Sequence, residues 1–256
     1  MIEKILQIKR GVNMLKIIPK DKHKKYIDYQ GIQSYFHFSY DNYYSPANLF
    51  YGVIYGLNDY TISPNSGLKP TKNQNIEVIT YVYEGTLTHV NSLNKTAILP
   101  RGSLNYLSSG TGLSHSERNI DRKLLKMITF FIVPNQFNTK PHFESVYANP
   151  VHRLNKLTKM IGNDENDLLS IKQDFEFYVC DSEGDQYYNH SIEANRQAYI
   201  VCLKGRLNLN GQILEEQGAA RIEKTQLKIE SLEASTFILI DMCKTIDFRT
   251  HRKSKN

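Results

Sequence analysis

Short apolar runs separated by turn signals dominate residues 35–127, and they alternate in the manner of β-strands. The clearest strand is "NIEVITYVYEG" (75–85), which is rich in β-branched and aromatic residues and ends at a glycine. The next stretch, "GTLTHVNSLNKTAILPRG" (85–102), predicts a hairpin with its tip at residues 91–94. A buried strand follows in "LLKMITFFIVP" (124–134). This spacing is typical of a β-sandwich or barrel and not of βαβ units.

Strands are predicted again in the second half of the chain. They lie at "DLLSIKQDFEFYVCDS" (167–182), "AYIVCLKGRLNLNGQIL" (198–214) and "QLKIESLEASTFILIDM" (226–242). Within the second of these, Asn210-Gly211 is a strong hairpin signal. The intervening residues 135–157 are polar and marked by prolines, so we expect the domain junction there and no core element.

A short motif links the two halves. Glu84-Gly85-Thr86-Leu87 stands between a β-rich strand and its return, and Lys204-Gly205-Arg206-Leu207 has the same setting in the second half. Because 256 residues are comfortable for two domains, this echo favours two tandem barrels of one type. The predicted parts are an N-terminal extension at 1–23 with a second candidate start at Met14, a first barrel at 24–138, a linker and second barrel at 139–243, and a basic tail at 244–256.

Charge and composition narrow the function classes. The net charge is +6, but residues 1–25 carry a balance of +6 and residues 244–256 one of +4, which leaves −4 for the rest. We therefore expect solvated basic ends and no nucleic-acid partner. Cys180, Cys202 and Cys243 lack disulfide or metal spacing, which indicates reduced core thiols. No apolar run could span a membrane and no signal peptide is present, so a cytoplasmic protein without a membrane partner is expected.

Candidate chemistry is concentrated in "SSGTGLSHSE" (108–117), where His115 and Glu117 are two residues apart. Side chains at such a spacing project from the same face of a strand, so both could aim at one point. Two ligands alone rarely hold an ion, so the identity of their partners decides whether the segment is a metal site.

These stretches resemble the pirin family of bicupins. The matching segments are "YFHFSYDNYYSP" (35–46), "NIEVITYVYEGTLTHVNSLNK" (75–95), "LPRGSLNYLSSGTGLSHSERN" (99–119), "IVPNQFNTKPHFE" (132–144), "IKQDFEFYVC" (171–180) and "AYIVCLKGRLNLNGQIL" (198–214). The resemblance implies an all-β fold of two tandem cupin barrels, that is, jelly rolls. It also implies a metal, usually iron, in the N-terminal barrel, bound by a His-x-His pair and by His115 and Glu117. Some members resemble quercetin 2,3-dioxygenases in activity, and the nuclear pirins are transcriptional co-regulators.

The chain departs from the family pattern where the His-x-His pair is expected. With Glu77 anchoring the register, Thr71 and Asn73 stand at the two histidine positions. Neutral oxygen donors are weak ligands for the ions that imidazole binds, and His115 with Glu117 falls short of a facial triad of two histidines and a carboxylate. Glu77 is the nearest substitute, and a site that included it would suit manganese or magnesium. A structural, hydrogen-bonded role for Glu77 is the favoured alternative.

Three functions stay open at this point. The favoured one is a pirin-like bicupin with a degenerate metal site and no cofactor, which binds an unknown small molecule in the N-terminal barrel or a protein partner. The second is a quercetinase-type dioxygenase with one iron or manganese ion, in which His115 and Glu117 would be catalytic. The third is metal-free acid–base chemistry by the same pair. His89, near the end of the predicted hairpin, is expected to be structural.

Overall fold

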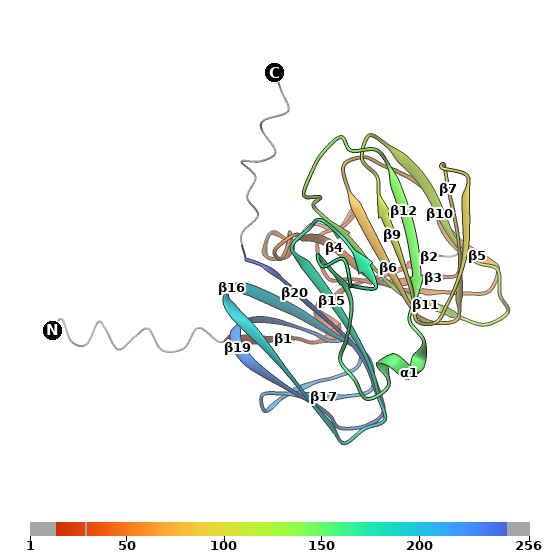
Figure 1. Cartoon of the computed structure of the whole chain (residues 1–256). Helices are drawn as coiled ribbons and strands as arrows, with labels where there is room; N and C mark the ends of the chain where they lie inside the picture. The colour runs from red at the N-terminus through yellow and green to blue at the C-terminus, as the bar shows by residue number, and fades with distance from the viewer. Residues whose placement is uncertain (1–13, 29, 245–256) are drawn as a thin grey trace.

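Two sheets form the first barrel in the computed structural model, which describes residues 14–28 and 30–244. The larger sheet has the order β12-β9-β6-β11-β4-β3-β2, and the smaller has the order β5-β10-β7-β8 (Figure 1). Their bounds are β2 Lys24–Asp28, β3 Ile32–Phe36, β4 Ile54–Ile62, β5 Ser66–Asn73, β6 Glu77–Glu84, β7 Thr86–Asn91, β8 Lys95–Pro100, β9 Ser103–Ser108, β10 Leu113–Asn119, β11 Leu125–Ile132 and β12 His142–Tyr147.

The second barrel is built from one strongly curved sheet of nine strands, in the order β14-β13-β15-β20-β16-β19-β17-β18, with β1 added to β19. Its strands are β1 Leu15–Ile18, β13 Thr158–Gly162, β14 Leu169–Ser170, β15 Phe175–Ser182, β16 Gln186–Lys204, β17 Leu207–Leu209, β18 Gln212–Leu214, β19 Ala219–Ser231 and β20 Ser235–Cys243. The two barrels together make the all-β bicupin that the sequence predicts.

Helices are short in the described residues. They are the 3₁₀ turns η2 (Lys20–Lys22) and η3 (Pro46–Asn48) and the single turn α1 (Pro150–Arg153). Asn149 caps α1, because its side chain accepts a hydrogen bond from the backbone N–H of Val151. None of the helices in the described ranges is long or apolar enough to cross a bilayer.

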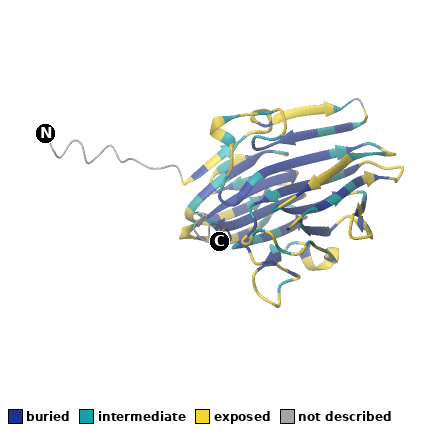
Figure 2. Cartoon of the chain, turned by 90° about the horizontal axis from the view of Figure 1, so that it is seen from above, coloured by how far each residue is buried: buried dark blue, intermediate teal, exposed yellow. Residues whose placement is uncertain are grey.

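The largest apolar cluster lies between the barrels. It joins residues of both large sheets, among them Tyr81 and Phe130 from the first barrel and Phe177 and Tyr199 from the second. Separate clusters fill the interior of each barrel. Side chains along the large-sheet strands therefore point alternately into a barrel interior and toward the barrel junction. Both faces of these strands are buried (Figure 2).

The strands expected from the sequence are present. The hairpin predicted at 85–102 is β7 and β8, and Asn210-Gly211 forms the turn between β17 and β18. The echoed glycines Gly85 and Gly205 have φ angles of +78° and +84° at equivalent strand returns. A left-handed backbone favours glycine there, which explains why both halves use it.

Two segments differ from the sequence expectation. Strand β12 lies inside the stretch expected to be a linker, and it pairs with β9 at the edge of the first barrel. A strand at the edge of a sheet needs no continuous apolar face, so the polar sequence of β12 did not indicate a strand. Strand β1 lies inside the expected N-terminal extension, yet it pairs with β19 of the second barrel. Residues 1–13 and 245–256, which include most of the expected basic tail, lie outside the described residues.

Candidate functional site

His115 and Glu117 lie on β10, the strand between β5 and β7 in the small sheet. Both side chains are buried, with 8% and 2% of their surfaces exposed. A register shift between them bends the strand at this point. The structure thus brings the pair together on the interior face of the first barrel, as their spacing predicts.

The neighbouring strands decide what faces this pair. On β5, Thr71 is the register partner of His115, and on β7 the partner is Asn91. Glu117 has His89 of β7 as its register partner. The group opposite the Glu117 carboxylate is therefore the imidazole of His89, a residue whose sequence setting predicts only a structural role.

Glu117 is buried but well supplied with partners. Its Oε1 accepts a hydrogen bond of 3.1 Å from the Thr80 hydroxyl and lies 3.9 Å from Nδ1 of His89. Burial by itself raises the pKa of Glu117, but hydrogen bonding with His89 and the charges of His115 and His89 outweigh it and leave the pKa below its usual value. Glu117 is thus an ionised acceptor inside the barrel.

His89 is fully buried, and both of its ring nitrogens are engaged. Nε2 lies 3.3 Å from Nδ2 of Asn91, whose Oδ1 accepts the backbone N–H of Leu93, so the Asn91 amide is oriented to donate to the ring. Nδ1, which then carries the proton, has the Glu117 carboxylate as its acceptor, and the Asn105 amide nitrogen lies beside it at 3.1 Å. His89 therefore orients the carboxylate and has no free lone pair for a metal.

Aromatic contacts hold this imidazole in place. The His89 ring stacks on His115 at a centroid distance of 5.5 Å and on Phe143 of β12 at 5.0 Å. Sequence reasoning missed both partners, because His89 and Phe143 come from segments that looked peripheral. The one available signal was the alternation of the predicted hairpin, which points His89 and Asn91 to the same face.

Thr71 and Asn73 occupy β5 in different settings. Thr71 is exposed, and its hydroxyl donates to the carbonyl of Lys69 on its own strand at 3.3 Å. Asn73 is buried, and its Nδ2 has no partner. Nδ1 of His115 also has no partner, and burial lowers the pKa of this histidine more than the charge of Glu117 raises it, so His115 is neutral at pH 7.

Glu77 does not join the site. Along β6 the side chains alternate, and Thr80 contacts Glu117 in the barrel interior, whereas Ile79 and Tyr81 pack at the barrel junction. Glu77 points to the same side of β6 as Ile79 and Tyr81, and on that side it lines a cavity together with Lys172 of the second barrel. The turn between β5 and β6, where Asn75 has a φ of +55°, breaks the extended register that would have aligned Glu77 with Asn73.

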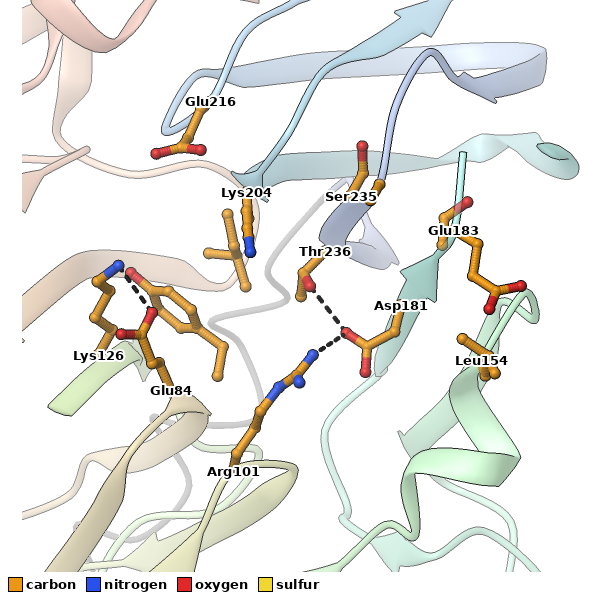
Figure 3. A pocket seen from close by; sticks show the side chains of 14 residues that line it. Glu84, Arg101, Lys126, Leu154, Asp181, Glu183, Lys204, Glu216, Ser235 and Thr236 are labelled. Atoms are coloured by element: carbon orange, nitrogen blue, oxygen red, sulfur yellow. Dashed lines mark hydrogen bonds and ion pairs between the residues drawn. The ribbon is translucent and has the colours of Figure 1, made fainter. Parts of the chain in front are cut away.

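A larger cavity of about 490 Å³ lies at the other end of the barrel junction (Figure 3). Its charged groups largely satisfy one another: Asp181 accepts from Arg101 at 3.0 Å and from Thr236 at 2.9 Å, and Lys126 pairs with Glu84 at 2.8 Å. Because the polar atoms are internally paired, we regard this cavity as a solvated seam between barrels and place the candidate chemistry at His115 and Glu117.

Comparison with known proteins supports the same two-part reading of the chain. The family model described as pirin matches residues 20–132, and the model described as the quercetinase C-terminal cupin domain matches residues 161–242. A Pseudomonas aeruginosa protein, provisionally named a quercetin 2,3-dioxygenase, is 30% identical over 209 residues, which cover 80% of this chain and 90% of the relative. The quercetin 2,3-dioxygenase of Escherichia coli K12 is 27% identical over 213 residues, covering 82% and 91%.

Solved structures give the same result. The crystal structure of YhhW from Escherichia coli superposes with a TM-score of 0.84 at 25% identity, over 90% of this chain and 98% of that one. A second structure, of this bacterial pirin in complex with nickel(II), has a TM-score of 0.83, again at 25% identity, over 90% and 100% of the two chains. With sequence and structural likeness extending over both barrels, this chain belongs to the pirin family.

Proposed function

We propose that this protein is a pirin-family bicupin with a degenerate metal site, and that its N-terminal barrel binds a small polar molecule without a catalytic transition metal. The observation that carries the proposal is the residue facing His115. An exposed threonine stands there, and its hydroxyl bonds its own strand. The barrel thus lacks the nitrogen donors that iron or nickel would need.

The remaining donors do not compensate for this loss. Asn73 offers a neutral amide, and the nitrogens of His89 are engaged by Asn91 and Glu117. In the described part of the chain, no three histidine, cysteine, aspartate or glutamate side chains are grouped so as to hold an ion. His115 and Glu117 are a pair without a third ligand, and the residues present do not fit the iron site that the family resemblance implies.

The interior nevertheless favours a polar guest. Several buried polar atoms of the first barrel have no partner, among them Asn58 Oδ1, Asn73 Nδ2, Asn105 Oδ1 and His115 Nδ1. Buried polar atoms are nearly always hydrogen-bonded, so such a group needs a polar partner. A small molecule with several donors and acceptors, bound beside the Glu117 carboxylate, would supply it.

A quercetin 2,3-dioxygenase-like activity is the second candidate, because relatives over most of the chain carry that name. It would require a metal set unlike the family pattern, with His115 and Glu117 as two of the ligands. Flavonol turnover, followed by the loss of quercetin absorbance, tests this directly. Turnover that disappears in Glu117→Gln would establish the second candidate and contradict our proposal.

Metal analysis tests the proposal itself. We expect protein purified without chelator or nickel resin to carry far less than one transition metal ion per chain. The double variant Thr71→His with Asn73→His should restore the donors facing His115 and raise the content toward one ion per chain. Elemental mass spectrometry after dialysis against iron(II), manganese(II) or nickel(II) measures both.

A matched control separates a restored site from chance chelation. Gln226→His with Lys228→His places the same His-x-His spacing on exposed positions of β19 in the second barrel. This control should gain much less tightly held metal than the β5 variant. A parent protein that already holds one ion per chain, lost in His115→Ala, would contradict the proposal, and an unchanged β5 variant would contradict the assignment of Thr71 and Asn73.

A further inference from the structure

A smaller cavity of about 210 Å³ lies behind the large sheet of the first barrel, on the face of β6 that points away from Glu117. It is bounded by β6 and β9, by residues 135–142 and by the segment after β14 of the second barrel. Its volume corresponds to about seven water molecules at about 30 Å³ each, which suits a small organic acid. The polar lining includes Glu77, Tyr106, Asn135, Lys140, His142 and Lys172.

Glu77 forms the floor of this cavity and is only half satisfied. Its side chain is 5% exposed, and Oε2 is buried without any partner. Tyr106, also buried, is hydrogen-bonded to the carboxyl group. A buried carboxyl oxygen without a partner is costly, and the residue that carries this one lines the cavity. The carboxyl group therefore has the character of a ligand contact and not of a structural bond.

The rim has the opposite character. Lys140, in the loop between β11 and β12 of the first barrel, and Lys172, in the second barrel, both line the cavity and are exposed. Neither forms an ion pair with any described residue. Two unpaired ammonium groups next to a half-satisfied carboxyl group favour a guest that is anionic at one end and carries a hydrogen-bonding group at the other.

The hydrogen-bonding group is best a hydroxyl. Burial, partly offset by the hydrogen bond with Tyr106, raises the pKa of Glu77 to about 7, so this carboxyl group can donate to a hydroxyl or accept from it. A ligand ammonium would enter a pocket that already holds two lysines, where like charges repel. A neutral donor avoids that repulsion.

We propose that this cavity is a second binding site, distinct from the barrel interior, for a small hydroxy acid whose carboxylate lies between Lys140 and Lys172 and whose hydroxyl bonds Glu77. Strands β6, β9 and β12 contribute to both sites, but none of the side chains that contact His115 or Glu117 lines this cavity. The site requires both barrels, because Glu77 and Lys172 come from different ones. It would therefore be absent from an isolated N-terminal barrel.

Nuclear magnetic resonance with simple probes tests this site on the full chain. Backbone amide shifts are followed while glycolate, acetate or glycine is added. We expect saturable shifts for residues 106–108, 135–140 and 170–172, with glycolate binding about tenfold tighter than acetate, because a site built around a hydroxyl rejects an analogue that lacks it. Glycine should bind more weakly than glycolate. Amides of β7 and β10 should not move, which separates this site from the barrel interior.

Variants assign the contacts. Lys172→Gln should weaken glycolate about fivefold or more, whereas Lys228→Gln, an exposed and unpaired lysine on β19, should leave it unchanged. Glu77→Leu should bind glycolate and acetate equally, and its spectrum also reports whether it is folded. Equal binding of glycolate and acetate to the parent, tighter binding of glycine, equal effects of the two lysine variants, or a lack of saturation at the cavity amides would each overturn the proposal.

Discussion

Two buried carboxyl groups lie against opposite faces of the large sheet of the first barrel, and their pKa values are shifted in opposite directions. Glu117, from the small sheet, lies against the interior face, and Glu77 lies on the outer face. Glu117 is 2% exposed and accepts a hydrogen bond from Thr80, with His89 as a second partner, and its pKa is lowered. Glu77 is 5% exposed, has one unpartnered oxygen, and its pKa is raised to about 7. The extent of burial is nearly the same in both.

The difference shows that the supply of donors, not burial, sets the charge of a buried acid in this protein. Desolvation disfavours the charged form of both groups. Only Glu117 has an imidazole and a hydroxyl directed at it, and these favour the carboxylate. Loss of the donors to Glu117, which are His89 and Thr80, should therefore destabilise the protein. Loss of the Glu77 carboxyl group should instead stabilise it.

The largest effect is expected from His89→Leu. This variant leaves the Glu117 carboxylate buried with a single donor, and removing one partner of a buried charged group costs about 3 kcal/mol of unfolding free energy. The loss should be greatest at neutral pH and shrink as the pH falls toward the lowered pKa of Glu117, where the folded state takes up the proton that the unfolded chain already holds. Urea unfolding at pH 4 and pH 7 measures it, with the exposed His152→Leu as control. A pH-independent loss would point to packing alone.

Glu77→Gln should act in the opposite direction. In the parent, the folded state holds a proton that the unfolded chain releases between pH 4.5 and about 7, so stability falls as the pH rises through that window. The glutamine variant lacks this loss and should be more stable than the parent above pH 7, by about 3 kcal/mol, the free energy that corresponds to raising a pKa from 4.5 to about 7. Below pH 4 the two proteins should differ little. A stability gap that does not change between pH 4 and pH 8 would contradict a raised pKa of Glu77.

Thr80→Val removes the hydroxyl donated to Glu117 and should cost about 2 kcal/mol at pH 7, in the range for a hydrogen bond to a charged group. The pKa of Glu117 should rise, which carboxyl carbon chemical shifts report. Thr61→Val on β4, at a half-buried position whose side chain forms no hydrogen bond with a described residue, is the matched control. Equal losses in the two variants would show that the Thr80 bond adds nothing beyond packing.

The smallest effect is expected from Tyr106→Phe. The tyrosine hydroxyl is the one side-chain donor that lowers the pKa of Glu77, so its loss should raise that pKa above about 7. The change in stability should be about 1 kcal/mol, as for an ordinary hydrogen bond. Carboxyl carbon titration of the variant checks the direction, and a lowered pKa would contradict the proposed contact.

Much of the fold follows from local patterns. The sequence predicts the hairpin of β7 and β8 and the buried strand β11, because apolar alternation and turn residues act over only a few positions. Strand β12 was not predicted, because a polar edge strand carries little periodic signal. The pairing of β1 with the second barrel was not predicted either, since a partner about two hundred residues away along the chain leaves no mark on a four-residue segment.

The candidate site divides in the same way. The convergence of His115 and Glu117 follows from their spacing on one strand, and the resemblance to the family predicts that Thr71 and Asn73 replace its histidine pair. The role of His89 depends on the register of β7 against β10, which no local pattern specifies. The direction of the Glu77 side chain was not predictable from its distance to Asn73, because the turn at Asn75 interrupts the alternation between them.

By itself, the sequence determined that this chain makes two tandem β-barrels, because side-chain direction in a strand repeats every two residues and the turn signals are local. Its resemblance to the pirin family adds the prediction that Thr71 and Asn73 stand where the metal-binding histidines are expected. Only the tertiary structure decided which buried groups meet: His89 with Glu117, and Glu77 with a cavity shared by both barrels. Strand register and barrel packing set those contacts, and they depend on surfaces that come together only when the whole chain has folded.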